Sequence, residues 1–77
     1  MEIKVLGIGC GKCKTTYAVI EKVINENNIP ATITKVEDIM EIMNYNILAT
    51  PAVVVDGVLK IKGYVPSERE IKELLGV

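Results

Sequence analysis

Residues 2–14 read EIKVLGIGCGKCK and combine an apolar run with two closely spaced cysteines. The nearly continuous apolar run at residues 2–8, with its β-branched members, predicts a strand that is buried on both faces. A helix is predicted to follow, from about residue 11 to residue 27, because apolar side chains then recur at helical spacing. Cys10 and Cys13 therefore lie where a strand passes into a helix, and they are the only cysteines of the chain.

The middle of the chain predicts a second strand and a short helix. The sequence Asn27-Asn28-Ile29-Pro30 ends the first helix, and the alternation in residues 31–36 predicts a half-buried strand near a sheet edge. Asp38 is expected to cap a helix over residues 38–45. Ile39, Ile42 and Met43 are expected on one face of this helix. Met40 and Met43 are expected to fill gaps in the core rather than to bind soft metals.

The following segment predicts a hairpin. Residues 52–55 form a buried strand, and Asp56-Gly57 is a strong two-residue signal for a hairpin turn. Residues 58–62 return as an antiparallel strand. Two apolar side chains of this strand are expected on one face, Leu59 and Ile61.

The last helix completes an α/β domain that spans residues 1–77. Ser67 and Glu70 match a capping box, and the apolar residues after it are expected to face the core. These residues are Ile71, Leu74 and Leu75. The order β-α-β-α-β-β-α fits a four-stranded mixed sheet with helices on both faces, in which the first strand is central and parallel to the second. Cys10 would then lie at the carboxyl end of a central strand, where open α/β sheets place their sites.

The composition excludes several classes of function. The chain has 77 residues, is 49% hydrophobic and carries a formal charge of −1, so it should form one small core. Its Lys and Arg residues alternate with Asp and Glu, which argues against a nucleic-acid partner. The first residues are too short and acidic for a signal peptide, and no apolar run approaches the length that spans a membrane. We expect a cytoplasmic monomer.

Two cysteines so close in sequence are expected to be reactive rather than structural. In the chain-entropy model, a disulfide across so small a loop restrains the unfolded state by only about 2 kcal/mol, against about 4.7 for a 100-residue loop. Zinc usually takes four Cys or His ligands, whereas this chain has no His. Four thiolates from a dimer, or two-coordinate Cu(I), remain open as alternatives.

The helix start gives the two sulfur atoms different roles. Unpaired N–H groups, the positive end of the helix dipole, and the charges of Lys12 and Lys14 all favour a thiolate at Cys10. Such settings lower a cysteine pKa from about 8.5 to roughly 3.5–7.5. Cys13 lies one turn further in, where a thiol is more buried and less acidic. Cys10 is thus expected to attack a substrate disulfide, and Cys13 to release the product.

The whole chain resembles the thioredoxin superfamily in its small, glutaredoxin-sized form, the redox-active disulfide proteins of prokaryotes. The resemblance rests on Cys-Gly-Lys-Cys at a strand-to-helix junction, on Thr50-Pro51 before Val-Val-Val-Asp-Gly, and on the order of elements. It implies that Cys10 is the nucleophile and Cys13 the resolving thiol of a redox-active disulfide, with no other cofactor. The implied partners are protein disulfides and an unidentified reductase.

The resemblance also implies a binding surface around the dithiol. Pro51 would be a cis-proline facing it, and the backbone of Thr50 would pair with an extended substrate segment. Gly63 would lie in the third loop of the site. From the residues themselves, Gly9 and Gly11 either let a partner reach the sulfur or simply form the strand-to-helix turn. Lys12 either steers acidic partners or is simply solvated.

The chain departs from the best-known thioredoxins, which carry Trp-Cys-Gly-Pro-Cys and a buried carboxylate beneath the resolving cysteine. This chain has no Trp, has Lys12 in place of that proline, and has no acid on its first strand beyond Glu2. A clear glutathione site is also not evident. Because no buried carboxylate is present, a bound water or a different group must accept the proton of Cys13. Tyr17, one turn further along the helix, could shield the sulfur of Cys13, but its place at the core edge is the favoured interpretation.

The main alternative function is a Cu(I) carrier that binds the metal through the two thiolates. Metallochaperone domains of this length also place CxxC at the start of a first helix. Their order is β-α-β-β-α-β, however, and they end in a strand, whereas this chain predicts a final helix. A dimer sharing an iron–sulfur cluster is less favoured, because two thiolates per chain need outside ligands.

Overall fold

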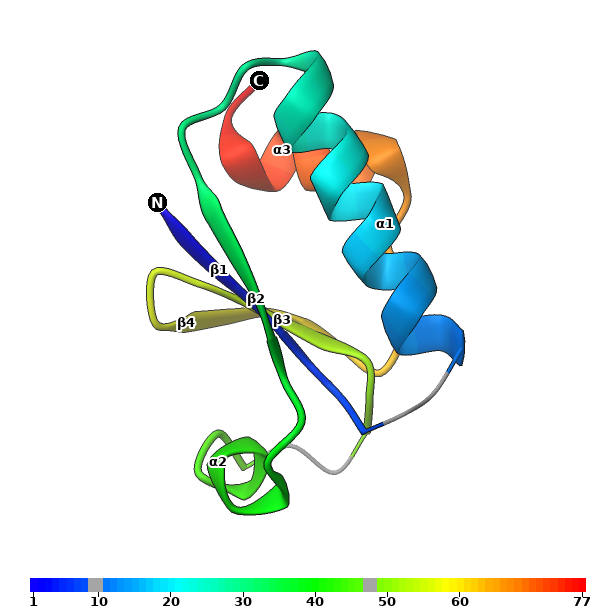
Figure 1. Ribbon diagram of the computed structural model, residues 1–77, viewed down its shortest axis with the longest axis vertical. Coiled ribbons are helices and arrows are strands. Elements are labelled where there is room, and N and C mark those ends of the chain that lie inside the picture. Colours follow the sequence, from blue (N-terminus) through cyan, green and yellow to red (C-terminus); the bar gives the residue numbers. More distant parts are fainter. Residues whose placement is uncertain (9–10, 47–48) are drawn as a thin grey trace.

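The computed structural model describes residues 1–8, 11–46 and 49–77, and its elements follow the predicted order (Figure 1). They are β1 (Glu2–Leu6), α1 (Gly11–Glu26), β2 (Thr32–Val36), α2 (Ile39–Met43), β3 (Ala52–Val55), β4 (Val58–Lys62) and α3 (Glu68–Leu75). No helix in these described ranges is long and apolar enough to cross a membrane.

The strands form a mixed sheet with the order β2-β1-β3-β4, so β1 is central as predicted. β1 runs parallel to β2 and antiparallel to β3, and β3 pairs with β4 as a hairpin. The pairing with β2 extends beyond β1, because the N–H of Gly7 donates to the carbonyl oxygen of Val36 at 3.0 Å. The carboxyl ends of β1 and β2 thus lie together, and the pairing of β1 with β2 extends as far as Gly7.

Helices cover both faces of the sheet, which confirms the predicted layers. Figure 1 shows α1 and α3 lying together, with α2 apart from them. Ile3 and Val5 of β1 pack in the core beneath α1 and α3, whereas Leu6 packs in a second core with Ile42 of α2. Alternate residues of one strand therefore support two separate apolar layers.

The prediction for α2 is wrong in its packing. The helix covers only residues 39–43, and of its apolar side chains only Ile42 is buried. Ile39, Met40 and Met43 are 58%, 69% and 60% exposed. A helix of about one and a half turns points few side chains toward the sheet, so the remaining apolar residues face outward.

A β-bulge in the hairpin also corrects the prediction for β4. Val53 pairs with Ile61 but Val54 pairs with Leu59, so Lys60 is an extra residue opposite this step of β3. The bulge breaks the simple alternation of side chains along β4. As a result, Ile61 joins the core beneath α1 and α3, whereas Leu59 packs on the α2 side. The two side chains lie on opposite faces rather than on one.

The cap and turn residues that were predicted at the ends of helices and strands are confirmed. Asn28 adopts a left-handed conformation (φ 51°) after α1, and Asp38 caps α2 by accepting a hydrogen bond from an N–H at 2.9 Å. Asp56 and Gly57 both have positive φ, 48° and 82°, as a type I′ hairpin turn requires. The hydroxyl oxygen of Ser67 accepts a hydrogen bond from the N–H of residue 70 at 3.2 Å and caps α3.

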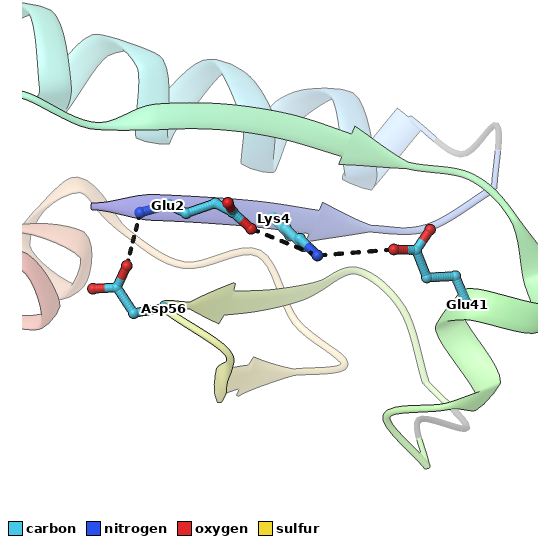
Figure 2. Close-up of polar contacts among 4 residues, drawn as sticks. All are labelled: Glu2, Lys4, Glu41 and Asp56. Atoms are coloured by element: carbon cyan, nitrogen blue, oxygen red, sulfur yellow. Dashed lines mark hydrogen bonds and ion pairs between the residues drawn. The ribbon is translucent and has the colours of Figure 1, made fainter.

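An ion pair between Lys4 and Glu41 links β1 to α2. Figure 2 shows the ammonium group of Lys4 between two carboxylates, with Nζ 3.6 Å from Glu2 and 3.8 Å from Glu41. The charge of Tyr45 is the largest cause that raises the pKa of Lys4 above its usual 10.5, and Glu2 and Glu41 add to it. Asp56 lies at the other end of β1, where it accepts a hydrogen bond from the N–H of Glu2 at 2.8 Å.

Candidate active site

The site is built around Cys13, near the start of α1. Cys13 is 9% exposed and is disulfide-bonded. Its buried position agrees with the expectation for a resolving cysteine. Cys10 lies outside the described residues, so its predicted exposure and acidity stay predictions. No group of three or more metal-ligating residues gathers within residues 1–8, 11–46 and 49–77.

Gly7 brings the end of β1 into contact with Cys13. A Cβ atom on Gly7 would lie 2.1 Å from the Sγ of Cys13 and 3.6 Å from the Cβ of Thr50. The first distance is far below any real contact, so the sulfur lies directly against the backbone of Gly7. The end of β1 and the start of α1 therefore meet the Thr50-Pro51 turn at this point, although the turn lies far from both in sequence.

Thr50 and Pro51 form the second side of the site. Their peptide bond is cis, as the resemblance implies for a proline that faces the dithiol. Pro51 is buried, whereas Thr50 is exposed beside the sulfur of Cys13. This arrangement leaves the Thr50 side of the turn accessible to a partner.

Gly63 holds the loop that follows β4 against the Thr50-Pro51 turn. Its N–H donates a hydrogen bond to the carbonyl oxygen of Pro51 at 2.9 Å. Its φ is +83°, and a Cβ there would lie 3.0 Å from the Cβ of Ala49. Both the backbone conformation and the close approach favour glycine at this position. The structure thus brings together Gly7, Cys13, Thr50, Pro51 and Gly63.

The first turn of α1 carries the two residues between the cysteines. Gly11 and Lys12 are exposed, and each carbonyl oxygen accepts a hydrogen bond from a threonine one turn later. Thr15 donates to Gly11 at 3.0 Å, and the buried Thr16 donates to Lys12 at 2.8 Å. This turn contains no acidic residue, so nothing within it offsets the positive end of the helix dipole.

Tyr17 belongs to the core edge. It is partly buried and packs against the core beneath α1 and α3. The Nζ of Lys35 on β2 lies 4.9 Å from the centre of its ring, within the range of a cation–π contact. These contacts support the core-edge interpretation over a shielding role for Tyr17.

Tyr64 follows Gly63 and donates a hydrogen bond from its hydroxyl to the carboxylate of Glu70. The Glu70 side chain is therefore engaged with Tyr64, and the predicted capping box is present only in its Ser67 half. The hydrogen bond to Glu70 is the main cause that raises the pKa of Tyr64 above 10.0, followed by desolvation and the charge of Glu70. This contact joins α3 to the loop around the site.

The variant Glu70→Gln is expected to lower the pKa of Tyr64 toward its usual value of about 10. Because folding raises this pKa, the contact stabilises the fold below pH ~10 and loses that effect as the tyrosine ionises above it. Titration of phenolate absorbance, with Tyr64→Phe identifying the signal, measures the shift. Glu73→Gln on the same helix, where Glu73 pairs with Arg69 at 3.6 Å, is the control and should leave the titration unchanged. An equal shift in both variants would refute the assignment.

Sequence reasoning missed Gly7 and Thr16. Gly7 was absorbed into the predicted strand at residues 2–8, although a glycine in an otherwise β-branched run often marks a close approach of two backbones or side chains. Thr16 is a polar residue on the buried side of a helix, and this pattern was available from the sequence. The partner of Gly7 was not predictable, because the contact with Cys13 depends on how α1 packs against the end of β1.

The family of the chain follows from this fold and from comparison with known proteins. The model of the thioredoxin domain matches residues 1–76, and the chain therefore belongs to the thioredoxin family of thiol–disulfide oxidoreductases. It is 42% identical to a thioredoxin of Methanocaldococcus jannaschii. The alignment of 73 residues covers 95% of this chain and 84% of that relative. It is also 35% identical to a thioredoxin of Methanothermobacter thermautotrophicus, and that alignment of 75 residues covers 97% of both chains.

Proposed function

We propose that this protein reduces disulfide bonds in other proteins through Cys10 and Cys13. The Cys10 thiolate attacks one sulfur of the substrate disulfide; an S–S bond forms between protein and substrate, and the other substrate sulfur leaves as a thiolate that takes a proton. Cys13 then loses its proton and attacks Cys10. A disulfide forms between Cys10 and Cys13 as the mixed disulfide breaks, the second substrate sulfur leaves as a thiolate that takes a proton, and the two electrons have passed to the substrate.

The position of Cys13 is the observation that carries this proposal. Its sulfur is buried against Gly7 and lies beside the cis-proline turn, one helical turn beyond Cys10 in sequence. A shielded second sulfur reacts chiefly with a partner held next to it, which suits a resolving cysteine. The helix start without acids, together with Lys12 and Lys14, favours the thiolate of Cys10.

The surface beside Cys13 suits an extended protein segment as substrate. Thr50 is exposed, and its backbone is proposed to pair with the substrate next to the disulfide. Gly11 and Lys12 would border the same segment from α1, and Gly63 from the far side of the turn. A separate reductase would return the disulfide of the protein to the dithiol. We further propose that the protein acts as a monomer in the cytoplasm.

The fold topology argues against the Cu(I) carrier. Carriers of this size have the order β-α-β-β-α-β, whereas here α2 separates β2 from β3 and α3 follows the hairpin. Such carriers need no proline facing the thiols, whereas a cis-proline turn lies beside Cys13 in this protein. Nothing in the relatives of the chain supports copper transport.

The proposal is tested with a model protein whose two chains are joined by disulfides, with dithiothreitol as electron donor. The native protein is expected to accelerate chain separation, and Cys10→Ser to abolish the acceleration. Val58→Ser, at an exposed position of the hairpin far from Cys13, serves as the control and should retain full activity. Activity that survives in Cys10→Ser would refute the mechanism, and stoichiometric Cu(I) retention without reductase activity would favour the carrier.

A further inference from the structure

Gly7 is fixed in place by its own backbone. It is buried directly after β1, and its N–H donates to the carbonyl oxygen of Val36 at 3.0 Å. The position of its Cα therefore follows from the pairing of β1 with β2 and cannot adjust easily. Any atom added to this Cα would project from a rigid part of the sheet.

A side chain on Gly7 would overlap the resolving cysteine. The added Cβ would lie 2.1 Å from Sγ and 3.2 Å from Cβ of Cys13, whereas ordinary contacts are 3.4–4 Å. Cys13 is short, so its sulfur can move away only by rotation about its single side-chain torsion or by displacement of α1. The other neighbour, Thr50, would lie at an ordinary 3.6 Å. The conflict is thus confined to Cys13 and is most severe at its sulfur.

We propose that Gly7 is a positioning residue that fixes the sulfur of Cys13 and thereby sets the redox equilibrium of the dithiol. This inference rests on the proposed function of Cys13 as the resolving thiol. In the oxidised protein the S–S bond holds the sulfur where it lies against Gly7. In the dithiol the sulfur is released from that bond and can rotate. A methyl group at residue 7 therefore disfavours the disulfide more than the dithiol.

The first test measures this equilibrium in Gly7→Ala with glutathione as the redox buffer. Two glutathione molecules reduce the protein disulfide, giving the dithiol and one glutathione disulfide, with two electrons and two protons transferred. The variant is expected to be reduced about tenfold more readily than the native protein, which corresponds to a potential about 30 mV higher. An unchanged or lower potential would overturn the proposal.

Gly57→Ala is the matched control for general destabilisation. Gly57 has a φ of +82° and open space around it, so alanine strains the backbone there without a steric clash. The turn lies at the opposite end of β1 from Gly7, because the N–H of Asp56 donates to the carbonyl oxygen of Glu2 at 2.8 Å. This variant is expected to lose stability while its glutathione equilibrium stays at the native value. An equal shift in both variants would assign the effect to stability alone and overturn the proposal.

A second measurement removes the sulfur itself. Thermal unfolding compares the effect of Gly7→Ala in the oxidised native chain with its effect in a Cys10→Ser/Cys13→Ala background. The loss of Tm is expected to be at least halved in the background. Folding of Gly7→Ala only in that background would also support the proposal; an equal loss, or failure to fold in both, would overturn it. Reductase activity of the native protein is assayed separately, so its absence would refute the proposed function without deciding the role of Gly7.

Discussion

Cys13→Ser is expected to trap substrate as a mixed disulfide on Cys10 and to slow product release at least about 1,000-fold. A thiol held beside its target acts at an effective concentration far above that of any thiol in solution, with values of about 10⁵–10⁸ M for well-oriented groups. The buried position of Cys13 beside the cis-proline turn provides such a fixed geometry. Without it, release depends on the millimolar thiols of the buffer.

Mass spectrometry of the protein after reaction with a disulfide-linked peptide measures the trapped species. The adduct is expected on Cys10 of the Cys13→Ser chain, and stopped-flow kinetics should show normal formation but slow decay. The matched control is Cys10→Ser, which keeps the buried thiol and should form no stable adduct. Adducts that accumulate equally on both variants would contradict the assigned roles.

Substitutions of two neighbouring residues of α2 are expected to differ most in their effect on the free energy of unfolding. Ile42→Ala should lower the free energy of unfolding by about 2–4 kcal/mol, because this side chain is 5% exposed and packs with Leu6 and Val54. Met43→Ala should change it by less than about 0.5 kcal/mol, because that side chain is 60% exposed. Urea unfolding followed by circular dichroism measures both values.

Val36→Ala offers a check on where the effect of Ile42 arises. Val36 belongs to the same small core but lies on β2. Its truncation should therefore also lower the free energy of unfolding if this core and the sheet unfold together. A small loss for Ile42→Ala together with a large loss for Val36→Ala would mean that α2 unfolds separately. Equal losses for Ile42→Ala and Met43→Ala would contradict the packing of α2.

The order of elements was predictable because each one carries a distinct periodicity and a distinct stop signal. The apolar run of β1, the helical spacing in α1 and the Asp56-Gly57 turn all have short-range causes. The faces of β4 were not predictable. A bulge at Lys60 depends on how β4 pairs with β3, and nothing in the local sequence marks the extra residue. The exposure of Met40 and Met43 likewise depends on the short length of α2.

The chemistry of the site was more accessible to sequence than its geometry. The Cys-Gly-Lys-Cys motif and Thr50-Pro51 predict which segments form the site, and the cis peptide bond at Pro51 is confirmed. The contact between Gly7 and Cys13 joins β1 to α1 through a single glycine, and only the packed structure gives its distance. The hydrogen bond from Tyr64 to Glu70 was hidden for a related reason, since Glu70 matched a capping pattern with Ser67.

The bulge in β4 also makes one position of the chain tolerant to a change in length. Removal of Lys60 would leave Leu59 and Ile61 adjacent, and regular alternation would then keep each on the face that it already occupies. Removal of Leu59 would instead bring the charged Lys60 to the α2 face. The hairpin can therefore shorten by one residue at a single point without reversing its apolar sides.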